Sequence, residues 1–175
     1  MAGYYVYLIC SLPMLHFGAR PPLSLEKFIQ QARELLSQED VRFVEACTQQ
    51  NIYEQKLDQP TLNKWRAFDT ALRNELVKVR SSRKKIDPAK YLREDGFTEP
   101  AISHLALNAY RNPSILEGER LLDLERWRFL DELSIGHYFD LDFLIVYALK
   151  LLILERWEKI RTADKEQLIE EAIKI

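Results

Sequence analysis

The apolar stretch from Phe143 to Leu154 places the strongest constraint on how this chain can fold. Eleven of its twelve residues are apolar, the exception being Lys150, and it lies within a predicted helix from Asp140 to Ile160. A helix that is apolar on nearly every side has to be enclosed. The stretch is shorter than a membrane span of about 20 residues. The sequence therefore predicts a central helix surrounded within its own domain, or one that also offers surface to a partner protein.

Amphipathic helical patterns occupy most of the remaining chain. The segment after Ser24, an expected N-cap, carries apolar residues spaced three and four apart. Further helices are predicted to start at Ser37 with Asp40 in a capping box, near Pro60 with Asp58 as cap, at Asp87 with an end at Gly96, at Thr98-Glu99-Pro100, and at Ser114. A last amphipathic helix is expected from Thr162 through Leu168, Ile169, Ala172 and Ile173. The pattern leaves open whether the apolar stretch 4–17 is helix or strand; it lacks a basic flank and is interpreted as mature protein rather than a signal peptide.

The fold class expected from these patterns is all-α, a multi-helix bundle. Glycine and proline together number 12 of 175 residues, which is low for a turn-rich β protein. A single domain over 1–175 is expected, with a weak lobe boundary near 86–100. The sequence also contains a weak internal repeat, an echo at an offset of 54 residues that pairs Arg66 with Arg120 and Asp69 with Asp123. Such a repeat would suit a repeated helical unit.

Composition argues against several classes of function. The five glycines are at least fifteen residues apart, so neither a GxGxxG turn nor a Walker A loop can form. A net charge of -2 does not favour a dedicated nucleic-acid binder. The one basic run, Arg80 to Lys85, is interpreted as a solvated helix end, whose positive charges suit the negative end of the helix dipole. No nucleic-acid partner, cofactor or small-molecule substrate is expected.

Candidate catalytic residues are few. Cys10 and Cys47 form no CxxC pair, and the spacing of cysteines and histidines fits no structural zinc site. A nucleophilic cysteine would need one of His16, His104 or His137 as its base, and the spacing selects no pair. Cys47 falls on an apolar helix face, where packing is the simpler interpretation. An enzyme is not expected, and a cysteine- or metal-dependent one would require one of these groups to face a pocket.

His137 and Asp140 form the most suggestive local group, because a histidine and a carboxylate three residues apart could share a metal on one helical turn. Gly136 before them and the helix start after them indicate a turn instead. We therefore expect Asp140 to be an N-cap, His137 a hydrogen-bonded turn residue, and no metal to be bound.

The long helix also supplies the candidate partner interface. If part of its surface meets another protein, the contact residues predicted from the sequence are Phe143, Tyr147, Lys150, Leu154 and Trp157.

Several segments resemble an uncharacterised bacterial family whose genes accompany V-type ATPase operons. The resemblance lies in 112–123 (NPSILEGERLLD), 136–142 (GHYFDLD) and 147–157 (YALKLLILERW), and in the opening 4–13 (YYVYLICSLP) and 21–26 (PPLSLE). That family in turn resembles the C-type subunit of prokaryotic V-type ATPases, the counterpart of the eukaryotic d-type subunit, with Tyr147 and Lys150 as the similar element. The C-type subunit is an all-helical, non-catalytic funnel of three related lobes that seats the central stalk on the membrane rotor ring.

The resemblance implies a non-catalytic helical subunit or assembly factor of a V-type ATPase that couples the central stalk to the rotor ring. Its implied partners are other ATPase subunits, and its implied location is cytoplasmic, at the inner membrane through the complex. Leu151 and Ile153 stand where the C-type subunit often carries acidic residues, and 175 residues suit one or two lobes rather than three. The alternative is an independent helical protein-interaction module with no link to the ATPase.

Overall fold

The computed structural model describes residues 3–48, 58–93 and 99–163, and in these ranges the fold is all-helical, as the sequence predicts. The α-helices of this part are α1 (Gly3–Ser11), α2 (Leu25–Leu35), α3 (Gln38–Ala46), α4 (Pro60–Lys84), α5 (Pro100–Arg111), α6 (Ile115–Leu133) and α7 (Leu141–Thr162), with a 3-10 turn, η2 (Pro88–Tyr91). No strand occurs within these ranges.

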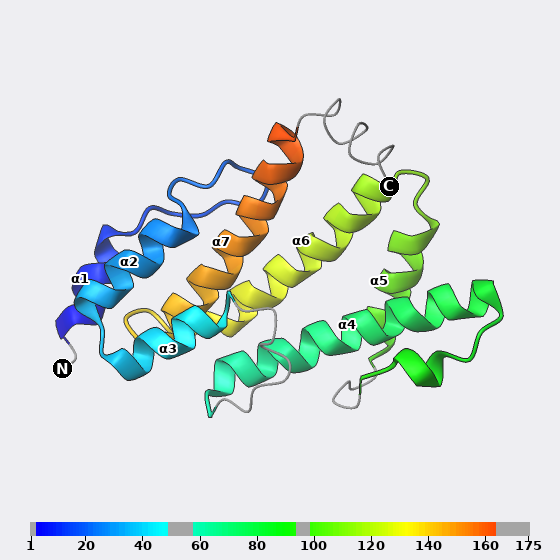
Figure 1. Cartoon of the computed structure of the whole chain (residues 1–175), viewed down its shortest axis with the longest axis horizontal. Coiled ribbons are helices and arrows are strands. Elements are labelled where there is room, and N and C mark those ends of the chain that lie inside the picture. Colours follow the sequence, from blue (N-terminus) through cyan, green and yellow to red (C-terminus); the bar gives the residue numbers. More distant parts are fainter. Residues whose placement is uncertain (1–2, 49–57, 94–98, 164–175) are drawn as a thin grey trace, which may run out of the picture.

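The helix α7 lies in the middle of the molecule (Figure 1). It contacts α2 and α3 on one side and α6 and α4 on the other. Every residue from Leu144 to Leu149 is buried, as are Leu151, Ile153 and Leu154. The prediction of a surrounded central helix is therefore confirmed. Among the described residues, no helix is both long and apolar enough to cross a bilayer, α7 included.

Local capping chemistry determines where most helices begin. Ser24, Ser37 and Ser114 each accept a hydrogen bond from the backbone N–H three residues ahead, at the starts of α2, α3 and α6. Ser37 also donates its hydroxyl to the Asp40 carboxylate, so the two residues of the predicted capping box are in contact through their side chains. Asp140 caps α7 through Phe143 N–H, as expected.

The cap of α4 and the helix expected from Asp87 differ from the sequence prediction, and two other predicted helix boundaries lie outside the described residues. The cap of α4 is Gln59, whose side chain accepts from Leu62 N–H, and not the expected Asp58. A side-chain amide oxygen serves the same purpose as a carboxylate here, and Gln59 is the buried residue of the two. The helix expected from Asp87 is only the 3-10 turn η2, and its predicted end at Gly96 lies outside the described residues, as does the predicted last helix beyond Ala163.

The segment 12–24 joins α1 to α2 and lies against α7 on the way (Figure 1). Tyr147 Oη donates to the Pro13 carbonyl at 2.9 Å, and Arg161 donates to the Ala19 carbonyl at 3.2 Å. The stretch 4–17, whose conformation the sequence leaves open, is thus helix α1 followed by this irregular segment. It forms one wall of a cavity described below.

Candidate functional site

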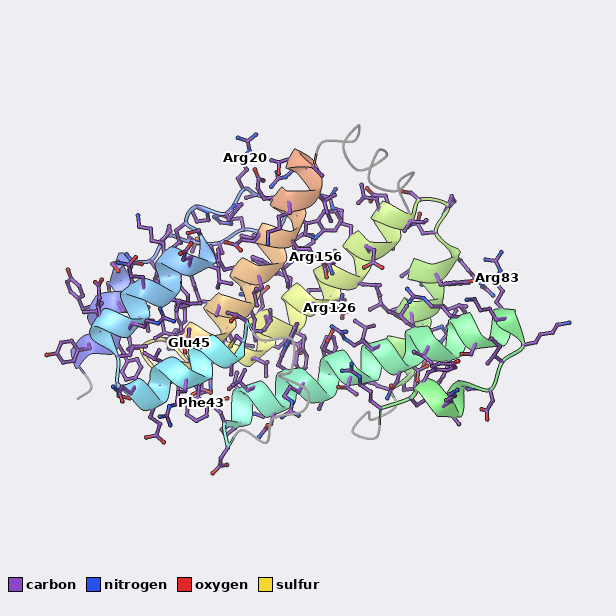
Figure 2. The ribbon with its side chains drawn as sticks, in the orientation of Figure 1. Arg20, Phe43, Glu45, Arg83, Arg126 and Arg156 are labelled. Carbon is purple, nitrogen blue, oxygen red and sulfur yellow. The ribbon has the colours of Figure 1, made fainter. Side chains whose placement is uncertain are left out.

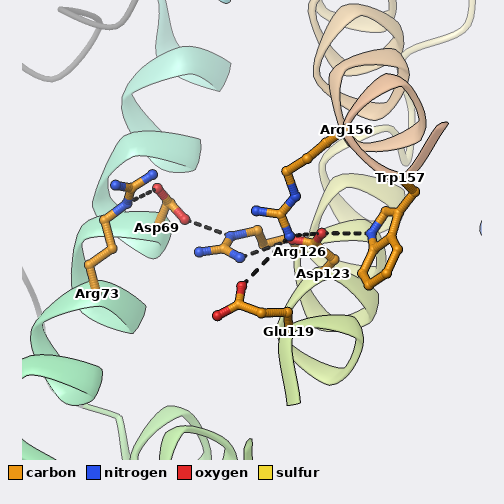
Figure 3. Close-up of polar contacts among 7 residues, drawn as sticks. All are labelled: Asp69, Arg73, Glu119, Asp123, Arg126, Arg156 and Trp157. Carbon is orange, nitrogen blue, oxygen red and sulfur yellow. Dashed lines mark hydrogen bonds and ion pairs between the residues drawn. The ribbon is translucent and has the colours of Figure 1, made fainter. Parts of the chain in front are cut away.

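A buried network of charged side chains joins α4, α6 and α7 (Figure 3). Arg126 on α6 donates to Asp69 on α4 at 2.7 Å and to Asp123, one turn earlier on α6, at 3.0 Å. Asp123 also accepts from Arg156 and, at 2.8 Å, from the indole N–H of Trp157, both on α7. Each of the two carboxylates is 1% exposed, so this network is part of the interior.

The network is electrically well matched. Burial alone would lower the pKa of Arg126, but the adjacent Asp69 and Asp123 carboxylates outweigh it and raise that pKa above its ordinary value. Buried charges are tolerated only when they are paired and hydrogen-bonded. Figure 2 shows Arg126 and Arg156 between the helices, whereas Arg20 and Arg83 extend from the periphery. The network thus fixes the positions of three helices relative to one another.

The sequence contains one signal of this network. Asp69 and Asp123 are the acidic pair of the echo at offset 54, and both converge on Arg126. Sequence reasoning misses Arg126 and Arg156, because a charged residue on a mixed helix looks like ordinary solvated surface until its partner helix is known.

A cavity of about 550 Å³ lies between the segment 12–24, the end of α1 and the helices α6 and α7. Its wall is mostly apolar, with a smaller polar part formed by His16 of the segment 12–24, Asp131 of α6, Ser134 directly after α6, and Lys150 of α7. Phe17 closes one side by an edge-to-face contact with Trp127, at a centroid separation of 5.6 Å. Apolar residues in the wall are Ile9, Leu12, Leu15, Phe17, Phe143 and Val146. We refer to it as the strap cavity.

A second hollow, of about 540 Å³, lies where the start of α6 meets the end of α7, and we call it the terminal groove. Leu116, Trp157 and Ile160 supply apolar surface, Arg120 and Arg161 supply positive charge, and Glu117 adds a negative charge. Arg161 also pairs with Glu158 at 2.6 Å. Leu116 and Ile160 are 49% and 43% exposed, so their apolar surface is accessible in the described structure.

The predicted interface residues separate into three environments. Phe143, Tyr147 and Lys150 all line the strap cavity. Trp157 lines the terminal groove and bonds to Asp123. Leu154 is fully buried in the core, so it cannot touch a partner and can only pack beneath residues that do. Burial raises the pKa of Tyr147 to about 12, so its hydroxyl remains a proton donor to Pro13.

His137 and Asp140 occupy the turn before α7, as expected. His137 Nδ1 lies 2.6 Å from an Asp140 oxygen, and this hydrogen bond raises the pKa of the histidine despite the opposing effect of burial. Asp142 adds a third potential ligand atom, all three lying within 4.8 Å of one another. However, Asp142 already accepts from Gln59 and Thr61, Asp140 caps α7, and the positive end of that helix opposes a cation. These roles account for the group without a metal.

The remaining candidates are dispersed. Cys47 is buried, and burial raises its pKa to about 12, which keeps the thiol protonated; Cys10 is exposed. His104 lines a hollow of about 420 Å³ together with Glu99, Glu125 and Glu132, and it makes no hydrogen bond or ion pair within the described part of the chain. The structure therefore brings neither cysteine together with His104 or His137.

The basic run at the end of α4 is exposed, from Ser82 to Lys85 in particular. Arg83 donates to the Tyr110 hydroxyl of α5 at 3.0 Å, and Lys85 takes the left-handed conformation that ends the helix. These contacts agree with a capped, solvated helix end.

Comparison with known proteins locates similarity in the carboxy-terminal part of the chain. No curated protein and no solved structure matches it. Residues 100–175, which include α5, α6, α7 and thus both Asp123 and Arg126, match the model of a family described as a protein of unknown function, DUF2764. The part of the chain that carries most of the buried charge network is therefore similar to this family.

Proposed function

We propose that this chain is a non-catalytic helical subunit or assembly factor of a V-type ATPase, which helps to couple the central stalk to the membrane rotor ring. The proposal starts from the resemblance of the segments around 112–123, 136–142 and 147–157. The observation that carries it is the terminal groove, which presents apolar and positively charged side chains beside helices that the buried network holds together.

A component that transmits force needs helices that do not slide past one another. Arg126 links α4 to α6, and Asp123 links α6 to α7, so sliding one of these helices past another would break an ion pair that involves a buried carboxylate. This supports a rigid body that acts by shape and surface complementarity, with no bond made or broken by its own residues.

The terminal groove is the surface that we assign to the partner. Ile160 and Leu116 would be covered by apolar side chains, and Arg120 and Arg161 would meet acidic ones. Tyrosine, tryptophan and arginine in a patch are typical of residues that carry binding energy, and Trp157, Arg120 and Arg161 line this groove. The partner would therefore be an ATPase component with an acidic, apolar contact face.

The test is recovery of ATPase subunits with the affinity-tagged chain from gently solubilised membranes of its own source. Ile160→Glu places a negative charge in the groove and is expected to reduce recovery at least fivefold. Gln38→Glu, which adds the same charge at an exposed position in the first turn of α3, is the matched control and should leave recovery unchanged. Absence of every ATPase component from the wild-type sample would overturn the proposal.

The alternative, an independent helical interaction module, uses the same groove. It predicts that Ile160→Glu abolishes binding to a defined partner that does not belong to the ATPase. Gene neighbourhood separates the two proposals, since only the first expects the gene to stand beside ATPase genes.

A further inference from the structure

The strap cavity has the size and composition of a small-molecule site. Ligand pockets typically have volumes of about 300–1,000 Å³, apolar walls and a few polar groups that orient the ligand. The strap cavity has a volume of about 550 Å³; its charged groups, Asp131 and Lys150, come from α6 and α7, and His16 of the segment 12–24 is a further polar group in its wall. Its walls come from the segment 12–24, α6 and α7, so the site exists only in the folded chain.

Lys150 is the group that indicates the ligand's charge. Its side chain is 14% exposed, and its ammonium lies 5.2 Å from the centre of the Trp127 ring. Its one ionic partner in the described structure is Asp131, at 2.5 Å. An ammonium has three N–H donors, so two remain for a ligand. Because Asp131 is 57% exposed, water weakens its hold on Lys150.

We infer that the strap cavity binds an amphipathic monocarboxylate, with its apolar body among the residues of the segment 12–24 and its carboxylate on Lys150. A single ammonium suits a single negative charge. A phosphate monoester, which carries close to two charges, would bring more negative charge next to Asp131 than Lys150 can balance. Tyr147 stays bonded to Pro13 and holds the wall of the cavity closed on the apolar side.

Asp131 determines in which direction the affinity for a carboxylate should change when its charge is removed. In the free protein Asp131 accepts one hydrogen bond from the Lys150 ammonium, and its negative charge also repels an incoming carboxylate. Removal of its charge should therefore tighten binding of a carboxylate, although it removes a contact from the free protein. A cavity that bound a cation or a zwitterion through Asp131 would show the opposite change.

The experiment is calorimetric titration of the purified full chain with four probes of equal chain length: octanoate, 1-octanol, octyl phosphate and octyltrimethylammonium. Octanoate is expected to bind at least tenfold more tightly than each of the other three. Lys150→Met keeps the aliphatic packing on Trp127 and should reduce octanoate affinity to that of octanol. Lys90→Met removes an exposed lysine from η2 and should change nothing.

Asp131→Asn is the second variant, and its exposed position makes a folding defect unexpected even if Lys150→Met is unstable. It should lower the dissociation constant for octanoate severalfold and leave that for octanol unchanged. The inference is overturned if octanoate releases no heat at millimolar concentration, if octanol binds equally well, or if Asp131→Asn weakens octanoate. These results are independent of ATPase recovery, so this inference and the proposed function can fail separately.

Discussion

Replacement of Asp123 by asparagine tests the buried charge network directly. The substitution preserves the shape of the side chain and an oxygen for the Trp157 indole, but it removes the charge that faces Arg126 and Arg156. Arg126 keeps Asp69 as its remaining partner. The expected effect is therefore confined to one lost carboxylate in the interior.

The size of the effect follows from the two ion pairs. A hydrogen bond to a charged group contributes about 1.5–3 kcal/mol, which applies to the mostly buried Arg126. Arg156 is 45% exposed, so its pair adds at most about 1 kcal/mol. The free energy of unfolding should fall by about 3 kcal/mol. For a chain of this length, that lowers the melting temperature by about 6–12 °C.

The assay is urea unfolding followed by circular dichroism, with Glu132→Gln as the control, because Glu132 is an exposed carboxylate on the same helix. That control should stay within about 0.5 kcal/mol of wild type. A double-mutant cycle between Asp69→Asn and Asp123→Asn should show coupling of about 1 kcal/mol or more, since the two acids share Arg126. If Asp123→Asn matches the control, or if the two changes simply add, the network does not hold the helices as described.

Three further outcomes are expected. Gly118→Ala should cost about 1–3 kcal/mol in urea unfolding, because the added Cβ would lie 2.6 Å from the Ala109 carbonyl oxygen where α5 meets α6; an increase in stability, the usual result of this change inside a helix, would refute the close approach. A thiol reagent should label Cys10 quickly and Cys47 only after unfolding, since the latter is buried with its pKa raised to about 12; equal rates for both thiols would contradict this. The folded pKa of His137 is raised, so its stabilisation is complete below about pH 6.5 and is lost as the pH rises through the raised value; unfolding midpoints of His137→Gln should therefore converge with wild type at high pH, and a constant difference from about pH 5.5 to 8.5 would argue against the pair.

Most of the helices are predictable because their signals are local. Serine caps at Ser24, Ser37 and Ser114 act within three residues, and apolar spacing shows which side of each helix is buried. For α4 the sequence favours Asp58 over Gln59 as the cap, because aspartate is the commoner cap and burial cannot be read from neighbouring letters.

The candidate sites are only partly predictable. Phe143, Tyr147 and Lys150 are grouped correctly on one face because they repeat at helical spacing, and they do share the strap cavity. The other wall comes from the segment 12–24, whose place over α7 depends on contacts such as Tyr147 with Pro13, 134 residues apart. A local sequence pattern cannot predict a contact between residues that are so far apart in the chain.

The helical character of this protein and the interior position of α7 can both be read from the order of its residues, because an apolar helix without a polar face has no other stable place in water. Two features emerge only when the helices are packed: Asp69 and Asp123 share Arg126, and Lys150 closes a cavity rather than extending into solvent. Capping and periodicity act over a few residues, whereas ion pairs and cavities depend on which helices lie against one another.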